Sequence, residues 1–105
     1  MPRFEYETDA VELDDKGYLL DFEAWTPLLA EALALDEGID VLGDEHWRVI
    51  DFLRSYQQEN ETAPMIRVLC KETALTLQRI YDLFPGGPAK CACRVAGLPR
   101  PDSCV

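Results

Sequence analysis

Two cysteines near the carboxyl end of the chain have the residue type and the spacing for thiol chemistry. The chain ends in CACRVAGLPRPDSCV, which places Cys93 and the penultimate Cys104 eleven positions apart. Gly97, Pro99 and Pro101 lie between them, and a helix cannot continue through these prolines, so we predict an extended, stiffened arm. If the arm folds back along the preceding segment, the two sulfur atoms can meet. If it swings out, Cys104 reaches solvent or a partner.

The charges around these thiols decide how much reactive thiolate is present. Arg94, Arg100 and Lys90 would lower the pKa of Cys104. Asp102 and the terminal carboxylate would raise it, so the sequence leaves the sign open. The pair favours a reversible switch between an internal disulfide and an extended carrier arm. The alternatives are a redox sensor and an incidental thiol on a frayed terminus.

Other residues give weaker signals for chemistry. Cys91 and Cys93 form a C-x-C pair, but residues i and i+2 of a helix point in nearly opposite directions, which disfavours chelation. A zinc site needs about four ligands, and His46 is the single histidine of the chain, so we expect no metal and assign His46 a structural or surface role. Cys70, in the apolar stretch MIRVLCK, is predicted to be a buried packing residue. The chain has no cofactor-binding motif, and we expect no cofactor.

Length and charge narrow the class of protein. The 105 residues predict one domain, and the net charge of −10 argues against nucleic acid as a ligand. Residues 1–45 carry a net charge of −12, whereas residues 46–105 carry +2. No apolar run approaches the roughly 20 residues that span a bilayer. Because the start MPRFEYETDA has no apolar signal core, we expect a cytoplasmic protein without membrane insertion, whose cysteines are thiols.

Periodicity predicts a small β element followed by helices. The alternation in FEYE and the turn sequence DDKG indicate two or three short strands. Asp21 or Thr26 can cap the next segment, with Pro27 in its first turn and Gly38 as its end. Four further helices are expected. They are a helix capped by Asp44 with a stripe of Trp47, Ile50 and Leu53; a helix from Thr62 and Pro64 with Met65, Ile66, Val68 and Leu69 largely buried; a helix over Leu75–Phe84; and a short helix over Pro88–Ala96.

Three stretches of the sequence resemble the DsrC/TusE family of sulfur-carrier proteins. The tail LFPGGPAKCACRVAGLPRPDSCV carries the most specific resemblance, and DEHWRVIDFLRSYQQENETAPMIRVLCK and DDKGYLLDFEAW extend it over almost the whole chain. The resemblance implies an α+β fold, in which a small N-terminal β-hairpin or meander packs on an array of about five helices. It divides the chain into a globular domain, residues 1–97, and a mobile C-terminal arm, residues 98–105.

The same resemblance implies a function. The penultimate cysteine, here Cys104, would accept sulfur as a persulfide, and Cys93 would resolve it. Two cysteines at this spacing place the chain nearer the DsrC type, whose members are co-substrates of dissimilatory sulfite reductase and hold sulfur between the two cysteines as a trisulfide. The alternative is a TusE-like relay toward 2-thiouridine in tRNA, with Cys93 unused. The implied partners are protein sulfur donors and acceptors, and the chain would be a sulfurtransferase-type carrier more than a stand-alone catalyst.

Two departures from the family pattern and one rival function complete the expectations. ETALTLQRIYD, between RVLCK and LFP, is shorter and less basic than the family stretch, and Cys91 stands where glutamine is common, which suggests a divergent paralogue with its own partner. As an auxiliary thiol, Cys91 could scramble disulfides or hold sulfur. The rival is a helix-turn-helix regulator from about Asp44 to Phe84, whose recognition helix ETALTLQRIY offers Arg79 and, just before it, Lys71; the net charge disfavours it. The oligomeric state is left open.

Overall fold

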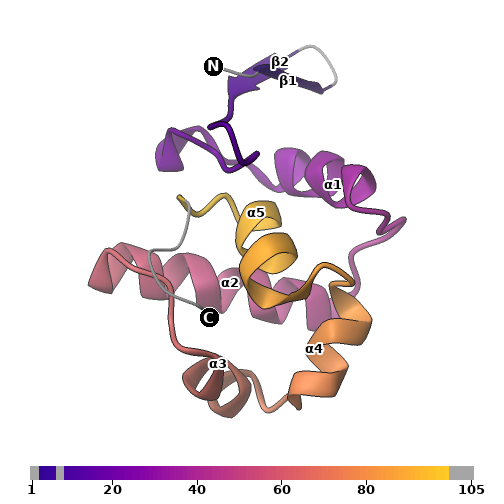
Figure 1. Cartoon of the computed structure of the whole chain (residues 1–105), viewed down its shortest axis with the longest axis vertical. Helices are drawn as coiled ribbons and strands as arrows, with labels where there is room; N and C mark the ends of the chain where they lie inside the picture. The colour runs from indigo at the N-terminus through magenta and orange to yellow at the C-terminus, as the bar shows by residue number, and fades with distance from the viewer. Residues whose placement is uncertain (1–2, 7–8, 100–105) are drawn as a thin grey trace.

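The computed structural model describes residues 3–6 and 9–99, which form a small antiparallel sheet and a set of packed helices (Figure 1). The α+β class, the N-terminal hairpin and the array of five helices are confirmed. In chain order the elements are β1 (Arg3–Tyr6), β2 (Asp9–Glu12), the 3-10 helix η1 (Phe22–Ala24), α1 (Pro27–Asp36), α2 (Asp44–Asn60), α3 (Ile66–Thr73), α4 (Leu77–Leu83), the π-helical turn η2 (Pro88–Ala92) and α5 (Cys93–Val95).

The N-terminal strands and the turn after them follow the sequence pattern. β1 and β2 pair antiparallel, and a single bridge joins Leu13 to Leu19 beyond them. In the DDKG turn the carboxylate of Asp14 accepts hydrogen bonds from the backbone N–H groups of Lys16 at 2.8 Å and Tyr18 at 2.9 Å. Gly17 has φ +92°, a conformation that residues with a Cβ rarely adopt. The predicted turn is therefore confirmed.

Both predicted caps near the start of the first long helix are used. The Asp21 carboxylate caps η1 through the N–H of Glu23, and the Thr26 hydroxyl caps α1 through the N–H of Leu29. The cap predicted at Asp44 is wrong by one position, because Gly43 is the cap residue of α2 and Asp44 is its first helical residue.

The third and fourth helices differ from their predictions. α3 begins at Ile66 and packs against α2 by one face, so Met65 is 60% exposed and Leu69 is buried. The expectation that Met65, Ile66 and Val68 are all largely buried is therefore wrong. The proposed recognition helix ETALTLQRIY is also wrong as one helix. Ala74, at φ +60°, ends α3, and α4 begins only at Leu77.

The C-terminal helical segment lies in the middle of the molecule. Figure 1 shows α5 between α1 and α2, and α5 packs against both. The fully buried large side chains around this centre come from the helices α1 to α5 and from three residues outside them. These side chains are Phe84, Leu19, Leu29, Leu33, Ile50, Leu53, Leu69, Ile80, Leu98, Val49, Val95 and Thr73. The segment that carries Cys91 and Cys93 is therefore part of the core.

Candidate functional site

Cys93 lies in this core at the first residue of α5. Its side chain has no exposed surface, and burial raises the pKa of the thiol to about 12. At pH 7 only about one molecule in 10⁵ would then carry the thiolate at this position. Cys93 is thus held as a neutral, protected thiol. Its assignment as the resolving thiol stays a prediction.

Cys91 is also buried, but its surroundings are different. Burial raises its pKa to about 11, a backbone hydrogen bond at Gly86 opposes this, and the carboxylate of Glu37 adds to the increase. Gly86 is required here because a Cβ at this position would lie 2.9 Å from the Cβ of Cys91. The auxiliary role suggested for Cys91 is untested, and its high pKa makes it a poor nucleophile in this conformation.

The end of α5 has the backbone pattern of a Schellman cap. The N–H of Leu98 donates to the carbonyl of Cys93 at 3.0 Å, and the N–H of Gly97 donates to the carbonyl of Arg94 at 3.0 Å. Gly97 has φ +74°, and a Cβ there would overlap the indole of Trp25. Leu98 is fully buried, so packed structure continues at least to this residue. The end of α5 is therefore held in a defined place within the fold.

Arg54 and Trp25 hold the end of α5 in place. Arg54 Nη1 donates to the carbonyl of Ala96 at 2.9 Å and Nη2 to that of Phe22 at 3.2 Å. Its guanidinium lies 3.9 Å from the ring centre of Phe22 and 4.1 Å from that of Trp25. Trp25 Nε1 donates to the carbonyl of Val95 at 3.0 Å. Burial lowers the pKa of Arg54, which Glu23 opposes, and a guanidinium remains charged under these conditions.

These two residues were missed by the sequence reasoning. Trp25 lies within DDKGYLLDFEAW, which was considered only as part of the family resemblance. Arg54 stands beside the apolar stripe of α2, next to Leu53, where an arginine reads as an ordinary solvated residue. The one available signal was a charged side chain on the border of a buried face.

Arg94 connects α5 to the N-terminal part of the chain. Its Nε donates to the carbonyl of Gly17 at 2.8 Å, and its Nη1 lies 2.8 Å from Asp36 Oδ2 and 2.6 Å from Glu37 Oε2. Burial lowers the pKa of Arg94, but the bonds to the two carboxylates outweigh this and raise it. Its charge therefore serves an ion-pair network and does not lower the pKa of Cys93, for which burial is the cause.

The remaining predicted residues are placed as follows. Cys104 and Arg100 lie outside the described residues. Cys70 is half-buried and packs against the core, so the predicted burial is only partial. The structural role of His46 is confirmed. Its Nδ1 accepts from the N–H of Gly43 at 3.1 Å, and its Nε2 lies 2.9 Å from the carbonyl oxygen of Leu83, which places the ring proton on Nε2.

Three further observations concern ligand classes. Arg79 pairs with Glu45 at 2.5 Å, so its charge is not free for phosphate. Within residues 3–6 and 9–99, no three His, Cys, Asp or Glu side chains gather in a way that could hold a metal ion. None of the helices found in that same part of the chain is long and apolar enough to cross a membrane.

Comparison with known sequences gives consistent results. The family model described as "DsrC like protein" matches residues 5–105. The gamma subunit of dissimilatory-type sulfite reductase from Nitratidesulfovibrio vulgaris (strain Hildenborough) is 43% identical over 105 residues, which cover 100% of both chains. The sulfurtransferase TusE from Pectobacterium atrosepticum is 43% identical over 108 residues, which cover 96% of this chain and 98% of the relative. Since the first alignment spans both chains completely, the short stretch before Phe84 is not peculiar to this chain.

Solved structures agree with the sequence relatives. A chain in the crystal structure of dissimilatory sulfite reductase I superposes with a TM-score of 0.92 at 42% identity and covers 99% of this chain and 100% of that one. The oxidized gamma subunit of the dissimilatory sulfite reductase from Archaeoglobus fulgidus superposes with a TM-score of 0.86 at 44% identity, with the same coverage.

Proposed function

From the premise that the chain belongs to the family of DsrC-like proteins, we propose that it is a sulfur carrier that loads sulfur on Cys104 and exchanges it with Cys93. It would act as a protein co-substrate in dissimilatory sulfur metabolism. The observation that carries this proposal is the complete alignment with a sulfite reductase gamma subunit in a chain that has both cysteines, eleven positions apart.

Loading is a thiol–persulfide exchange in which atoms and electrons balance. The thiolate of Cys104 attacks the outer sulfur of a donor persulfide, and the donor thiolate leaves. The product is a persulfide on Cys104, with no net oxidation or reduction. The reach supports this role, because six steps from Leu98 to Cys104 can extend about 20–22 Å from the body.

Discharge uses the second thiol. The thiolate of Cys93 attacks Sγ of Cys104, hydrosulfide leaves, and the two cysteines form a disulfide. In this step the sulfur of Cys93 is oxidised by one electron and the terminal persulfide sulfur is reduced by one electron to sulfide, while Sγ of Cys104 keeps its oxidation state. An external dithiol then has to reduce the disulfide before another cycle. A trisulfide, with the carried sulfur between the same two Sγ atoms, is two electrons more oxidised than the persulfide and the Cys93 thiol together, so it requires an enzyme-bound sulfur species more oxidised than a persulfide as the donor.

Burial of Cys93 would slow the discharge step. With a pKa of about 12, its thiolate is about a thousandfold scarcer at pH 7 than that of a thiol at the reference value of 9.0. A persulfide on Cys104 would therefore persist until the Cys93 thiol becomes accessible to it. This requires that Cys104 enters the buried surroundings of Cys93 or that the segment around Cys93 opens. Such a delay suits a carrier, which has to keep its sulfur until it meets the acceptor.

Mass spectrometry tests the assignment. The protein, reduced and then treated with a low-molecular-weight persulfide donor, should gain about 32 Da, which is one sulfur atom, and release hydrosulfide slowly. Cys104→Ser should abolish the gain. Cys93→Ser should keep the gain but release no hydrosulfide, and Cys70→Ser is the matched control that should behave as the parent. Equal loading of the parent and Cys104→Ser would overturn the proposal.

A TusE-like relay is the second candidate, and the identity to the Pectobacterium relative favours it specifically. In that role the persulfide passes from Cys104 directly to the next thiol, and Cys93 is not needed. The two candidates differ in one result. If the chain is a relay, the Cys93→Ser variant should still transfer sulfur to a protein acceptor. If the chain is a carrier with a resolving thiol, the same variant should load sulfur on Cys104 but not transfer it.

A further inference from the structure

Helix α1 is apolar on two opposite sides. One side, with Leu29 and Leu33, is buried where α1 packs against α5. The other side carries Leu28, Ala32 and Leu35, at the spacing of neighbours on one helix face, and Leu35 is 60% exposed. A surface helix normally has a polar outer side, whereas a helix that is apolar all round is normally covered all round. The outer side of α1 therefore has the composition of a covered surface.

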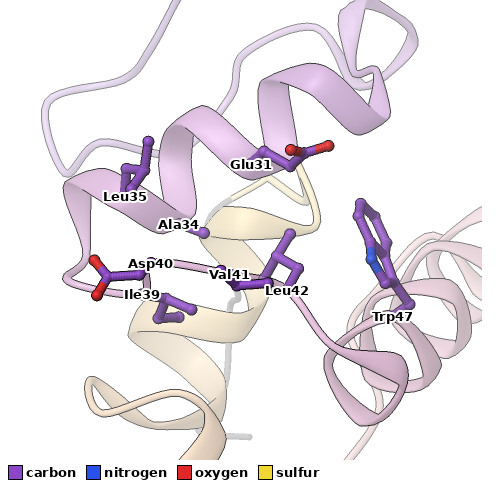
Figure 2. A pocket seen from close by; sticks show the side chains of 8 residues that line it. All are labelled: Glu31, Ala34, Leu35, Ile39, Asp40, Val41, Leu42 and Trp47. Carbon is purple, nitrogen blue, oxygen red and sulfur yellow. The ribbon is translucent and has the colours of Figure 1, made fainter.

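Two hollows extend this side of α1 into one groove. The first, of about 210 Å³, lies between α1 and Trp47 of α2, and Figure 2 shows the indole facing it beside Leu42. The second, of about 340 Å³, lies between α1 and β1. Glu31 and Leu35 line both hollows, so the two hollows are neighbours on the same side of α1. We call this surface the α1 groove. Its exposed or half-buried apolar residues include Phe4, Leu28, Ala32, Leu35, Val41 and Trp47.

The exposure of these side chains is too high for an ordinary surface. Val41 is 76% exposed and Leu35 is 60% exposed, and both border the hollow that also holds half-buried Trp47. Single exposed apolar residues are common, but a contiguous group around a concavity marks an interaction site. Aromatic residues in such a concavity are frequent anchors of binding.

The charges on the rim identify the kind of occupant. Glu5, Glu31 and Asp40 line the two hollows, and no basic side chain does among the residues that the structure describes. They belong to residues 1–45, which carry a net charge of −12. A second copy of the chain would bring two acidic rims together, and like charges across an interface are strongly unfavourable. The complementary surface has apolar side chains within a border of Lys and Arg.

We propose that the α1 groove is a docking surface for a protein that presents apolar side chains bordered by Lys and Arg. The proposal does not depend on sulfur transfer. If the carrier function holds, docking here would anchor the body on the partner while the C-terminal residues carry out the exchange. The groove and the thiols would then be separate contributions, one to affinity and one to chemistry.

A designed peptide tests the chemistry of the occupant. The probe is an amphipathic helix of about four turns with a leucine side bordered by lysines. Its counterpart has every lysine replaced by glutamate. In two-dimensional NMR of the ¹⁵N-labelled full chain, the lysine peptide should shift the indole signal of Trp47 and the amides of Leu35 and Val41. The glutamate peptide should bind at least about tenfold more weakly. Raising the ionic strength from about 0.05 M to about 0.5 M should weaken the lysine peptide.

Matched variants separate the groove from general attraction to an acidic protein. Leu35→Gln with Val41→Gln should weaken the lysine peptide at least about tenfold. Met65→Gln with Leu77→Gln removes two exposed apolar side chains elsewhere and should leave binding unchanged. Amide shifts on the parent decide the matter even if a variant fails to fold.

Three results would overturn the proposal. They are shifts outside the groove, equal binding of the two peptides, and full binding by the double groove variant. Sedimentation of the chain alone supplies one more test. A dimer that Leu35→Gln with Val41→Gln dissociates would make a second copy the occupant, which contradicts the stated partner. Sulfur loading on Cys104 by a small persulfide donor should be the same in all these variants, so failure of docking and failure of the carrier function give different results.

Discussion

Two short apolar segments pack against each other in this molecule, and their surroundings differ. The segment η2–α5 is enclosed, and from Cys91 to Leu98 only Arg94 is not fully buried. α1 is just as apolar, but it buries one side and leaves the other open beside two hollows. In η2–α5 the hydrophobic residues stabilise the fold and suppress thiol ionisation. In α1, Leu28 and Leu35 keep about half of their surface exposed and are available for a partner.

The largest effect is expected where the enclosed segment ends. Gly97→Ala has to adopt φ +74° and overlaps the indole of Trp25, so we expect a loss of about 3–5 kcal/mol in the free energy of unfolding. Denaturant unfolding measures this. Gly38→Ala is the matched control. Its φ is +90°, but no atom lies within 4 Å of the new Cβ, so it should lose only about 1–2 kcal/mol. Equal losses would mean that Trp25 moves aside freely.

Gly97 also illustrates what the sequence could predict. The turn at DDKG, the caps at Asp21 and Thr26 and the helix end at Gly97 depend on residues within a few positions, and each was found from the sequence. Arg54 of α2, by contrast, packs against Trp25, which lies 29 positions earlier in the chain. It also donates to the carbonyl of Ala96, which lies 42 positions later. Such convergence depends on the arrangement of layers, which no local pattern specifies.

The candidate site, too, could be predicted only in part from the sequence. The two thiols and their spacing were visible in the sequence, but the burial of Cys93 was not, because a short helix between two prolines and a glycine suggests a surface element. The error at Met65 has the reverse cause, since an apolar residue was assumed to be buried although α3 packs by only one face. Burial follows from the neighbours in space, and these were unknown.

The next effect concerns pH. Burial raises the pKa values of Cys91 to about 11 and of Cys93 to about 12, above an unfolded value of about 8.5. The unfolded chain therefore loses these protons first as pH rises. The stability that the two buried thiols contribute is complete below about pH 8.5 and is lost as pH rises through 11 to 12. Between pH 8.5 and pH 10 we expect a loss of about 2–4 kcal/mol.

Urea unfolding under reducing conditions at these two pH values measures the loss. The double variant Cys91→Ala with Cys93→Ala lacks both groups, so its stability should change less between the same pH values, whatever its absolute stability. If the free energy of unfolding changes equally with pH in parent and variant, the two thiols are not enclosed in solution. The segment η2–α5 would then not differ from α1 in being enclosed.

A smaller effect is expected from the side chain that holds the end of α5. Arg54→Met keeps much of the packing volume but loses the hydrogen bonds to the carbonyls of Ala96 and Phe22 and the contacts with two aromatic rings. We expect a loss of about 2–3 kcal/mol. Arg79→Met removes an exposed ion pair with Glu45 and should leave the stability close to that of the parent. Thermal unfolding of both variants tests this. Similar losses would mean that Arg54 is only a surface residue.

The smallest effect should occur on the open side of α1. Leu35 is 60% exposed on a helix, so Leu35→Ala removes few contacts, and alanine has at least the helix propensity of leucine. We expect the free energy of unfolding to change by less than about 0.5 kcal/mol, as for other surface substitutions. Urea unfolding at low protein concentration is the appropriate measurement, because association would add stability through the same surface. A loss above about 1 kcal/mol would mean that another part of this chain covers the outer side of α1 in solution. In that case both segments would be enclosed, and the α1 groove would have no room for a partner.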